Sequence, residues 1–116
     1  MLDLFHKHPT LFKTLTVKKN EKLGISHFFQ LSAYLYDDSR LEVNDNVYPD
    51  GRHKYSYQWM NPDNSLLRRW DNAPHWPDVT TYPHHVHVLD DKVVDASTIV
   101  DIEKLLDFLE SSVNPT

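Results

Sequence analysis

Hydrophobic and polar residues alternate through the first half of the chain with the two-residue period that is typical of β-strands. In residues 25–36, one face of an extended chain would carry the apolar residues Phe29, Leu31, Ala33 and Leu35. Further strands are predicted over residues 40–48, 52–60 and 65–70. The intervening segments DDS, PDG and NPDN are rich in turn-forming residues. The pattern therefore predicts an antiparallel β-meander.

The strand predicted over residues 52–60 has an aromatic face with two interpretations. Tyr55, Tyr57 and Trp59 fall on one side of this strand, and polar residues fall on the other. Such a face most often packs in a hydrophobic core. Aromatic rings on a sheet also stack on unpaired RNA bases, so the alternative is a nucleic-acid-binding surface.

The C-terminal part of the chain has helical periodicity. Within residues 97–112, apolar residues recur at helical spacing at Ile99, Ile102, Leu105, Leu106 and Leu109. Ser97 or Thr98 would be a good N-cap for this helix. Residues 1–14 indicate either a short helix with Pro9 in its first turn or an irregular lead into a first strand.

Together these elements predict an α+β fold, in which an antiparallel β-meander sheet carries one C-terminal amphipathic helix packed on one face. A chain of 116 residues fits a single domain. Its expected parts are a variable N-terminal segment (1–14), the sheet with a histidine-rich prolyl loop (15–96) and the C-terminal helix (97–112).

Composition narrows the classes of protein that fit this fold. The chain has no cysteine, which excludes disulfides and cysteine-ligated metals and suits a reducing cytoplasm. With only two glycines, it has no Gly-rich phosphate loop. A net charge of −5 argues against a protein that coats DNA. No segment approaches the ~18 consecutive apolar residues of a membrane span, so we expect a cytoplasmic protein without membrane contact.

Residues 68–87 concentrate the candidate chemistry, because they contain four of the eight histidines. If the segment TTYPHHVHV is extended, His85 and His87 share one face while His84 lies on the other. Two imidazoles placed in this way can bind one metal ion or one phosphate. The chain lacks the helical spacing and the cysteine partners of the usual zinc motifs, and we therefore expect no metal or other cofactor.

Cleavage of RNA is the reaction that fits these residues without a metal, because the 2′-hydroxyl of RNA supplies the nucleophile. Such a nuclease needs a general base, a general acid and a cation that stabilises the charge on the phosphoryl group. Histidine suits the first two roles, arginine suits the third, and an aspartate can orient a histidine. The candidate catalytic residues are Arg69, Asp71, His75, His84, His85 and His87. The candidate nucleic-acid-binding residues are Arg68, Tyr55, Tyr57, Trp59 and Asn72.

Structural explanations compete with this hypothesis. Asp71 and Asn72 precede Ala73 and Pro74, an order that is typical of an Asx turn. We interpret His6, His8, His27 and His53 as structural hydrogen-bonding residues. The alternative functions are therefore a non-catalytic protein-interaction module and a histidine-based metal-binding protein.

Two motifs, RWDNAPH (69–75) and PHHVH (83–87), follow the aromatic strand and resemble the TumE-like toxins of prokaryotic toxin–antitoxin systems. The resemblance covers residues 25–112. It implies a cognate antitoxin protein as partner and, by analogy with other small toxins, a metal-independent endoribonuclease that blocks translation by acting on RNA. A homodimer is one option for its assembly. Many such proteins have a second histidine after His75, where this chain has Trp76, a residue that cannot act as acid, base or ligand.

Overall fold

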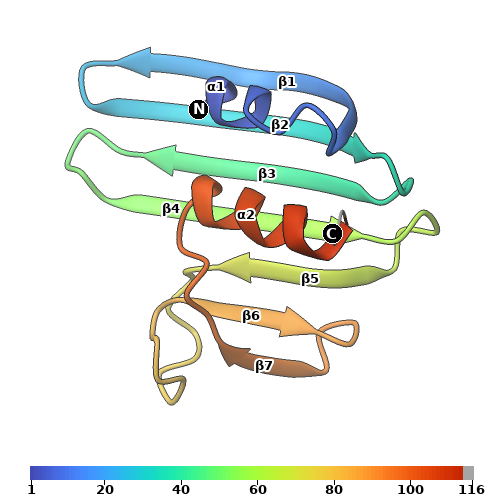
Figure 1. Cartoon of the computed structure of the whole chain (residues 1–116). Coiled ribbons are helices and arrows are strands. Elements are labelled where there is room, and N and C mark those ends of the chain that lie inside the picture. The colour runs from blue at the N-terminus through green and yellow to red at the C-terminus, as the bar shows by residue number, and fades with distance from the viewer. Residues whose placement is uncertain (114–116) are drawn as a thin grey trace.

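One seven-stranded antiparallel sheet forms the centre of the computed structural model, which describes residues 1–113. The strands are β1 (Phe12–Leu23), β2 (Ser26–Leu35), β3 (Arg40–Val47), β4 (His53–Met60), β5 (Leu66–Asp71), β6 (His85–Val88) and β7 (Val93–Ala96). Helix α1 (Leu2–His6) precedes them and helix α2 (Ile102–Val113) follows. The order of strands across the sheet is the order along the chain, so the sheet is a meander (Figure 1). The predicted α+β fold with a C-terminal helix is therefore confirmed.

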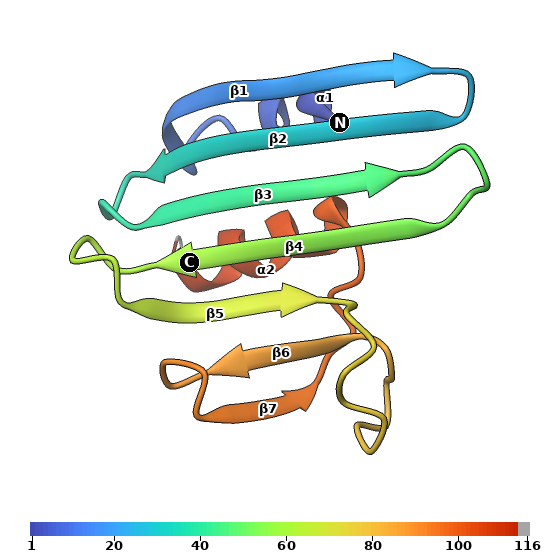
Figure 2. The same ribbon diagram turned by 180° about the vertical axis from the view of Figure 1, so that it is seen from behind.

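The two faces of the sheet have different surroundings. Both helices lie on one face (Figure 1), and the view from behind shows the other face without a helix (Figure 2). The covered face holds the apolar positions that the alternation predicted in β2, together with buried aromatic residues of β4 and β5 and one side of α2. This core includes Phe29, Leu31, Leu35, Tyr55, Tyr57, Trp70, Val86, Leu105, Leu106 and Leu109. The polar positions of the same strands therefore point to the uncovered face.

The C-terminal helix begins later than its hydrophobic periodicity indicated. Helix α2 starts at Ile102, and the side chain of Asp101 accepts the backbone N–H of Lys104 at 2.9 Å, as an N-cap does. The predicted N-cap at Ser97 or Thr98 is therefore wrong. The hydroxyl of Ser97 instead accepts the N–H of Ile99 at 3.1 Å, which makes a local turn before the helix.

The two ends of the sheet also differ from the sequence prediction. Helix α1 ends before Pro9, and β1 begins at Phe12, so a helix with Pro9 in its first turn is wrong. Strand β7, which pairs with β6 at the edge of the sheet, was not predicted because four residues are too few to show a period. Among the described residues, no helix has the length and apolarity needed to cross a membrane.

Candidate functional site

The pairing of β5 with β6 brings the two sequence motifs together. In this antiparallel register, Arg69 lies opposite His87 and Asp71 lies opposite His85. Because alternate residues of a strand point to the same side, all four side chains lie on the uncovered face of the sheet. His85 and His87 share this face, and Val86 between them lies in the core on the other face. This agrees with the prediction that the two histidines point to the same side of an extended segment.

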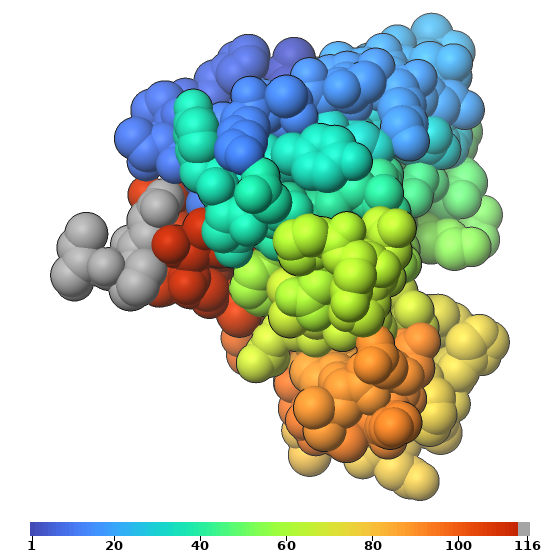
Figure 3. Space-filling view, turned by 90° about the vertical axis from the view of Figure 1, so that its right-hand side faces the viewer, coloured from blue at the N-terminus to red at the C-terminus, as the bar shows by residue number. Residues whose placement is uncertain are grey.

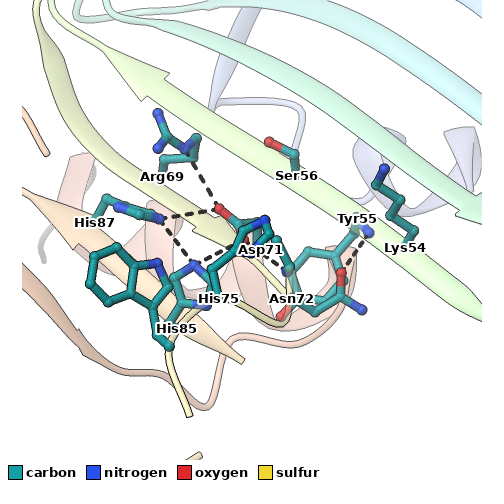
Figure 4. Close-up of a pocket in the computed structure, with 11 residues that line it drawn as sticks. Lys54, Tyr55, Ser56, Arg69, Asp71, Asn72, His75, His85 and His87 are labelled. Carbon is teal, nitrogen blue, oxygen red and sulfur yellow. Dashed lines mark hydrogen bonds and ion pairs between the residues drawn. The ribbon is translucent and has the colours of Figure 1, made fainter. Parts of the chain in front are cut away.

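A buried cluster of one carboxylate and two imidazoles is the centre of this arrangement. Asp71 Oδ1 lies 2.9 Å from His85 Nε2, and Asp71 Oδ2 lies 3.3 Å from His87 Nε2. The two Nε2 atoms are themselves 3.0 Å apart. Figure 4 shows the three side chains directed toward one another from β5 and β6. We call these three residues the triad; all of them are buried, with His85 only 1% exposed.

Each member of the triad has a further contact that fixes its orientation. His85 Nδ1 lies 2.9 Å from the carbonyl oxygen of Pro83, and because a carbonyl can only accept, Nδ1 carries the proton. His87 Nδ1 lies 3.3 Å from Asp91 Oδ1, although without the alignment of a hydrogen bond. The N–H of Ala73 donates to Asp71 Oδ1 at 3.0 Å, so the Asx turn indicated by the sequence is present.

Arg69 brings a positive charge to the edge of the triad. Its Nη2 lies 2.9 Å from Asp91 Oδ1, and its Nε lies 3.6 Å from Asp71 Oδ2. The guanidinium is therefore shared between two carboxylates. Burial, with the positive charge of Arg69 as the second cause, lowers the pKa of His87 below its usual value.

An open pocket of about 520 Å³ adjoins the triad. Its lining includes Lys54 and Ser56 of β4, Arg69 of β5, and His75 and Trp76 of the loop between β5 and β6. The prolyl segment thus folds back over the sheet, and Figure 3 shows it (yellow) beside β6 and β7 (orange). The ring of Trp76 lies 6.5 Å from that of His85 and 6.2 Å from that of His87, measured between centroids. Trp76 therefore covers part of the triad.

The aromatic residues of β4 lie on the opposite, helix-covered face. Tyr55 and Tyr57 are buried and stack on each other with ring centroids 4.8 Å apart, and burial raises the pKa of both hydroxyls. Trp59 is partly buried and donates from Nε1 to Ser39 Oγ at 2.9 Å. The structure therefore supports the core interpretation of this strand face, and these rings are not available as a base-stacking platform.

Three other candidates have their side-chain partners outside the triad, although Asn72 also lines the pocket. His84 turns toward Tyr55, whose hydroxyl is 2.8 Å from its Nδ1, and burial lowers the pKa of His84. The guanidinium of Arg68 lies over the ring of Phe108, 5.3 Å from its centroid, on the helix-covered face. Asn72 joins the ends of two strands: its amide oxygen accepts the N–H of Tyr55 at 3.1 Å, and its Nδ2 donates to the carbonyl of His53 at 2.7 Å.

Several histidines outside the motifs have the structural partners that the sequence analysis anticipated. His53 Nε2 lies 2.9 Å from Asp45 Oδ1, and His27 Nε2 lies 2.7 Å from Asn20 Oδ1. His8 Nδ1 is 3.5 Å from Glu110 Oε2, a contact that links the N-terminal segment to α2.

Sequence reasoning did not select Lys54, Ser56 or Asp91 as site residues. Lys54 and Ser56 lie on the polar side of β4, and the alternation of that strand already separated them from its aromatic side. Asp91 lies in the turn between β6 and β7, at a φ of 71°. Only the pairing of the strands around it brings Asp91 to Arg69 and His87.

Comparison with known proteins places the chain in a family but gives no close characterised relative. The family model described as "Toxin TumE" matches residues 1–114, nearly the whole chain. No curated protein matches the chain, and no solved structure matches it.

Proposed function

Because the chain belongs to the TumE toxin family, we propose that it is the toxin of a toxin–antitoxin pair and that it cleaves RNA in the pocket beside the triad. The single observation that supports this site most is the convergence of Asp71, His85 and His87 next to Arg69 and His75. A cognate antitoxin protein would hold the toxin inactive. A target in translation would place both proteins in the cytoplasm.

The proposed reaction follows from the chemistry of RNA and needs no metal. His87, held by Asp71, removes the proton of a 2′-hydroxyl, whose oxygen attacks the adjacent phosphorus atom. The bond from phosphorus to the 5′-oxygen breaks, and His75 donates a proton to that leaving oxygen. The products are a 2′,3′-cyclic phosphate and a free 5′-hydroxyl. Arg69 and Lys54 supply the positive charge that stabilises the phosphoryl oxygens in the transition state.

The local charge of the pocket matters because the chain as a whole carries a net charge of −5. Lys54 and Arg69 line the pocket, and among its other lining residues Asp71 is the only acid. RNA would therefore be attracted by the pocket itself rather than by a broad basic surface. Nucleic-acid affinity should be modest, and its dependence on salt should be shallow, because two cations neutralise few phosphates.

The direct test is incubation of the purified toxin with RNA in the presence of EDTA. We expect cleavage that leaves cyclic phosphate ends, and a loss of about 10²–10⁴-fold in rate for His87→Gln and for His75→Ala. His27→Gln, which changes a histidine of β2 outside the pocket, is the matched control and should retain full activity. Expression of the wild-type protein without its antitoxin should arrest growth, and the two pocket variants should not.

Each other result has a definite meaning. Cleavage that requires an added metal would contradict the metal-free reaction, but RNA would still be the substrate. Absence of cleavage in EDTA and with added metals, together with a growth arrest that His87→Gln does not relieve, would contradict the nuclease and favour a non-catalytic interaction module.

A further inference from the structure

Four polar atoms meet at the centre of the triad, namely the two carboxylate oxygens of Asp71 and the Nε2 atoms of His85 and His87. His85 donates from Nδ1 to the carbonyl of Pro83, which leaves a lone pair on Nε2 in the neutral ring. Asp71 presents two carboxylate oxygens, and its Oδ1 faces the Nε2 of His85 directly. These two lone pairs, held 2.9 Å apart, repel unless an electrophile lies between them. That electrophile is a shared proton or a metal ion.

The spacing of these atoms suits the coordination shell of a transition metal. With bonds of about 2.0–2.2 Å, neighbouring ligands around one ion are separated by roughly 2.8–3.1 Å at a right angle and roughly 3.3–3.6 Å at the tetrahedral angle. The distances in the triad are 2.9 Å (Asp71 Oδ1 to His85 Nε2), 3.0 Å (between the two Nε2 atoms) and 3.3 Å (Asp71 Oδ2 to His87 Nε2). The three residues therefore lie close enough together to share one ion, with one ligand atom of each within 4.8 Å of the others.

Groups outside the triad hold the ligands in the orientation that metal sites use. Metal-binding histidines commonly direct their second ring nitrogen to a carbonyl or a carboxylate. Here, Pro83 accepts a hydrogen bond from His85, and Asp91 places a carboxylate oxygen 3.3 Å from His87 Nδ1, without the alignment of a hydrogen bond. Asp71 is held by the N–H of Ala73. The sequence offered neither Pro83 nor Asp91 as part of such a site.

The charges around the triad also permit a cation. Arg69 is the nearest positive group, but Asp91 pairs with its Nη2 at 2.9 Å and offsets its charge. Lys54 lines the pocket from β4 and is not a member of the triad. Burial of the triad strengthens its interaction with an ion, because few water molecules compete for the carboxylate.

We propose that Asp71, His85 and His87 bind one divalent transition-metal ion. Two imidazoles and one carboxylate favour zinc, iron, nickel or cobalt over magnesium and calcium, which prefer oxygen ligands. Three protein ligands leave at least one position free, and the adjoining pocket is open to it. The ion displaces the shared proton, which passes to solvent.

A consequence of this site, which rests on the proposed function, is inhibition by zinc. The bound ion would occupy the Nε2 of His87, the residue assigned as the base in RNA cleavage. With the ion on Nε2, the neutral ring keeps its proton on Nδ1 and has no free lone pair, so His87 cannot accept a proton while the ion is bound. Zinc should therefore suppress the metal-free cleavage at concentrations that saturate the site.

The test of the site uses the full chain without a histidine tag, freed of metal with EDTA and then desalted. We expect titration with Co²⁺ to give a visible d–d absorption band that saturates at one ion per chain, and Zn²⁺ to abolish this band. Zn²⁺ should also raise the melting temperature. Replacement of one ligand, in Asp71→Asn or His85→Gln, should weaken binding by at least about 100-fold. His27→Gln should bind like the wild type.

The ligands are buried, so a variant that replaces one of them could fail to fold. A measurement on the wild-type protein avoids this problem. Upon addition of Zn²⁺, NMR should show shifts of the ring resonances of His85 and His87 and none of those of His27. Saturation at one ion with these shifts supports the site. Failure of the wild-type protein to bind Co²⁺ or Zn²⁺, or equal binding by the folded ligand variants, would overturn it. Neither measurement involves RNA, so either result is independent of the proposed cleavage.

Discussion

At the scale of single residues, Asp71 shows that a turn residue and a site residue can be the same residue. Its Oδ1 accepts the N–H of Ala73, which closes the Asx turn at the end of β5. The same carboxylate contacts His85 and His87. The turn was predictable from the order Asp, Asn, Ala, Pro. The histidine contacts were not, because they depend on a partner strand beyond a long loop.

A second histidine–carboxylate contact predicts how stability depends on pH. His53 hydrogen-bonds to the buried Asp45, and this raises the pKa of His53 above its usual 6.5 in the folded protein. A raised pKa stabilises the fold at pH values below 6.5, and the stabilisation is lost as the pH rises through the folded value. As the pH rises above 6.5, the free energy of unfolding should therefore fall more steeply in the wild type than in His53→Gln.

Urea denaturation of both proteins across this range measures the difference. The exposed His6 of α1 provides a control, because His6→Gln should leave the wild-type slope unchanged. Parallel curves for the wild type and His53→Gln would contradict the prediction. Three other histidines have lowered pKa values and make the free energy of unfolding rise with pH: His27, His84 and His87. The test is therefore the difference in slope between the wild type and His53→Gln, not the slope of either protein alone.

At the scale of elements, the sequence predicted what local periodicity can encode. The alternating segments became β2, β3, β4 and β5, and the apolar periodicity of the C-terminal part became α2. Periodicity did not locate the start of the helix. Ile99 fits the helical spacing, yet it lies before α2 and packs against the core from the connecting segment. An apolar residue can reach the same core from a helix or from the chain beside it.

The start of α2 has a measurable energetic consequence. Asp101 caps the N–H of Lys104, and its negative charge also lies at the positive end of the helix dipole. Asp101→Ala should lower the free energy of unfolding by about 0.5–2 kcal/mol. Chemical denaturation monitored by circular dichroism measures this loss.

Asp107→Ala is the matched control for the cap. Asp107 is an exposed acid within the same helix, and its replacement should change the free energy of unfolding by less than about 0.5 kcal/mol. If Thr98→Ala destabilised the protein more than Asp101→Ala, the helix would begin where the periodicity placed it, and the assignment of the cap would be wrong.

At the scale of the whole molecule, the fold separates packing from chemistry on two faces of one sheet. The face under α2 buries the aromatic residues of β4, and the other face carries the triad and its pocket. This separation explains why two adjacent residues of β5 lie on opposite faces of the sheet. Arg68 lies over Phe108 on the helix side, while Arg69 contacts Asp71 and Asp91 on the other.

The candidate site was only partly predictable for the same reason. The histidine-rich motif singled out His85 and His87, and the alternation placed them together. The register of β6 against β5 was hidden by the loop of residues 72–84, which has no repeating pattern. That register selects Asp71 and Arg69 as the partners of the two histidines, and it excludes His84 and Arg68.

The short length of β6 has a consequence for how the site can be lost. Both histidines lie in this four-residue strand, which is flanked by the equally short edge strand β7. Opening of this hairpin would part them from Asp71, while Phe108 of α2 keeps its ring contacts with Trp59 of β4 and Trp70 of β5. Amide hydrogen exchange should therefore be faster in β6 than in β3 under native conditions, and Zn²⁺ should slow exchange in β6 selectively. A partner protein that binds the opened hairpin would separate the two histidines from Asp71. The site would then be inactive while the rest of the protein stayed folded.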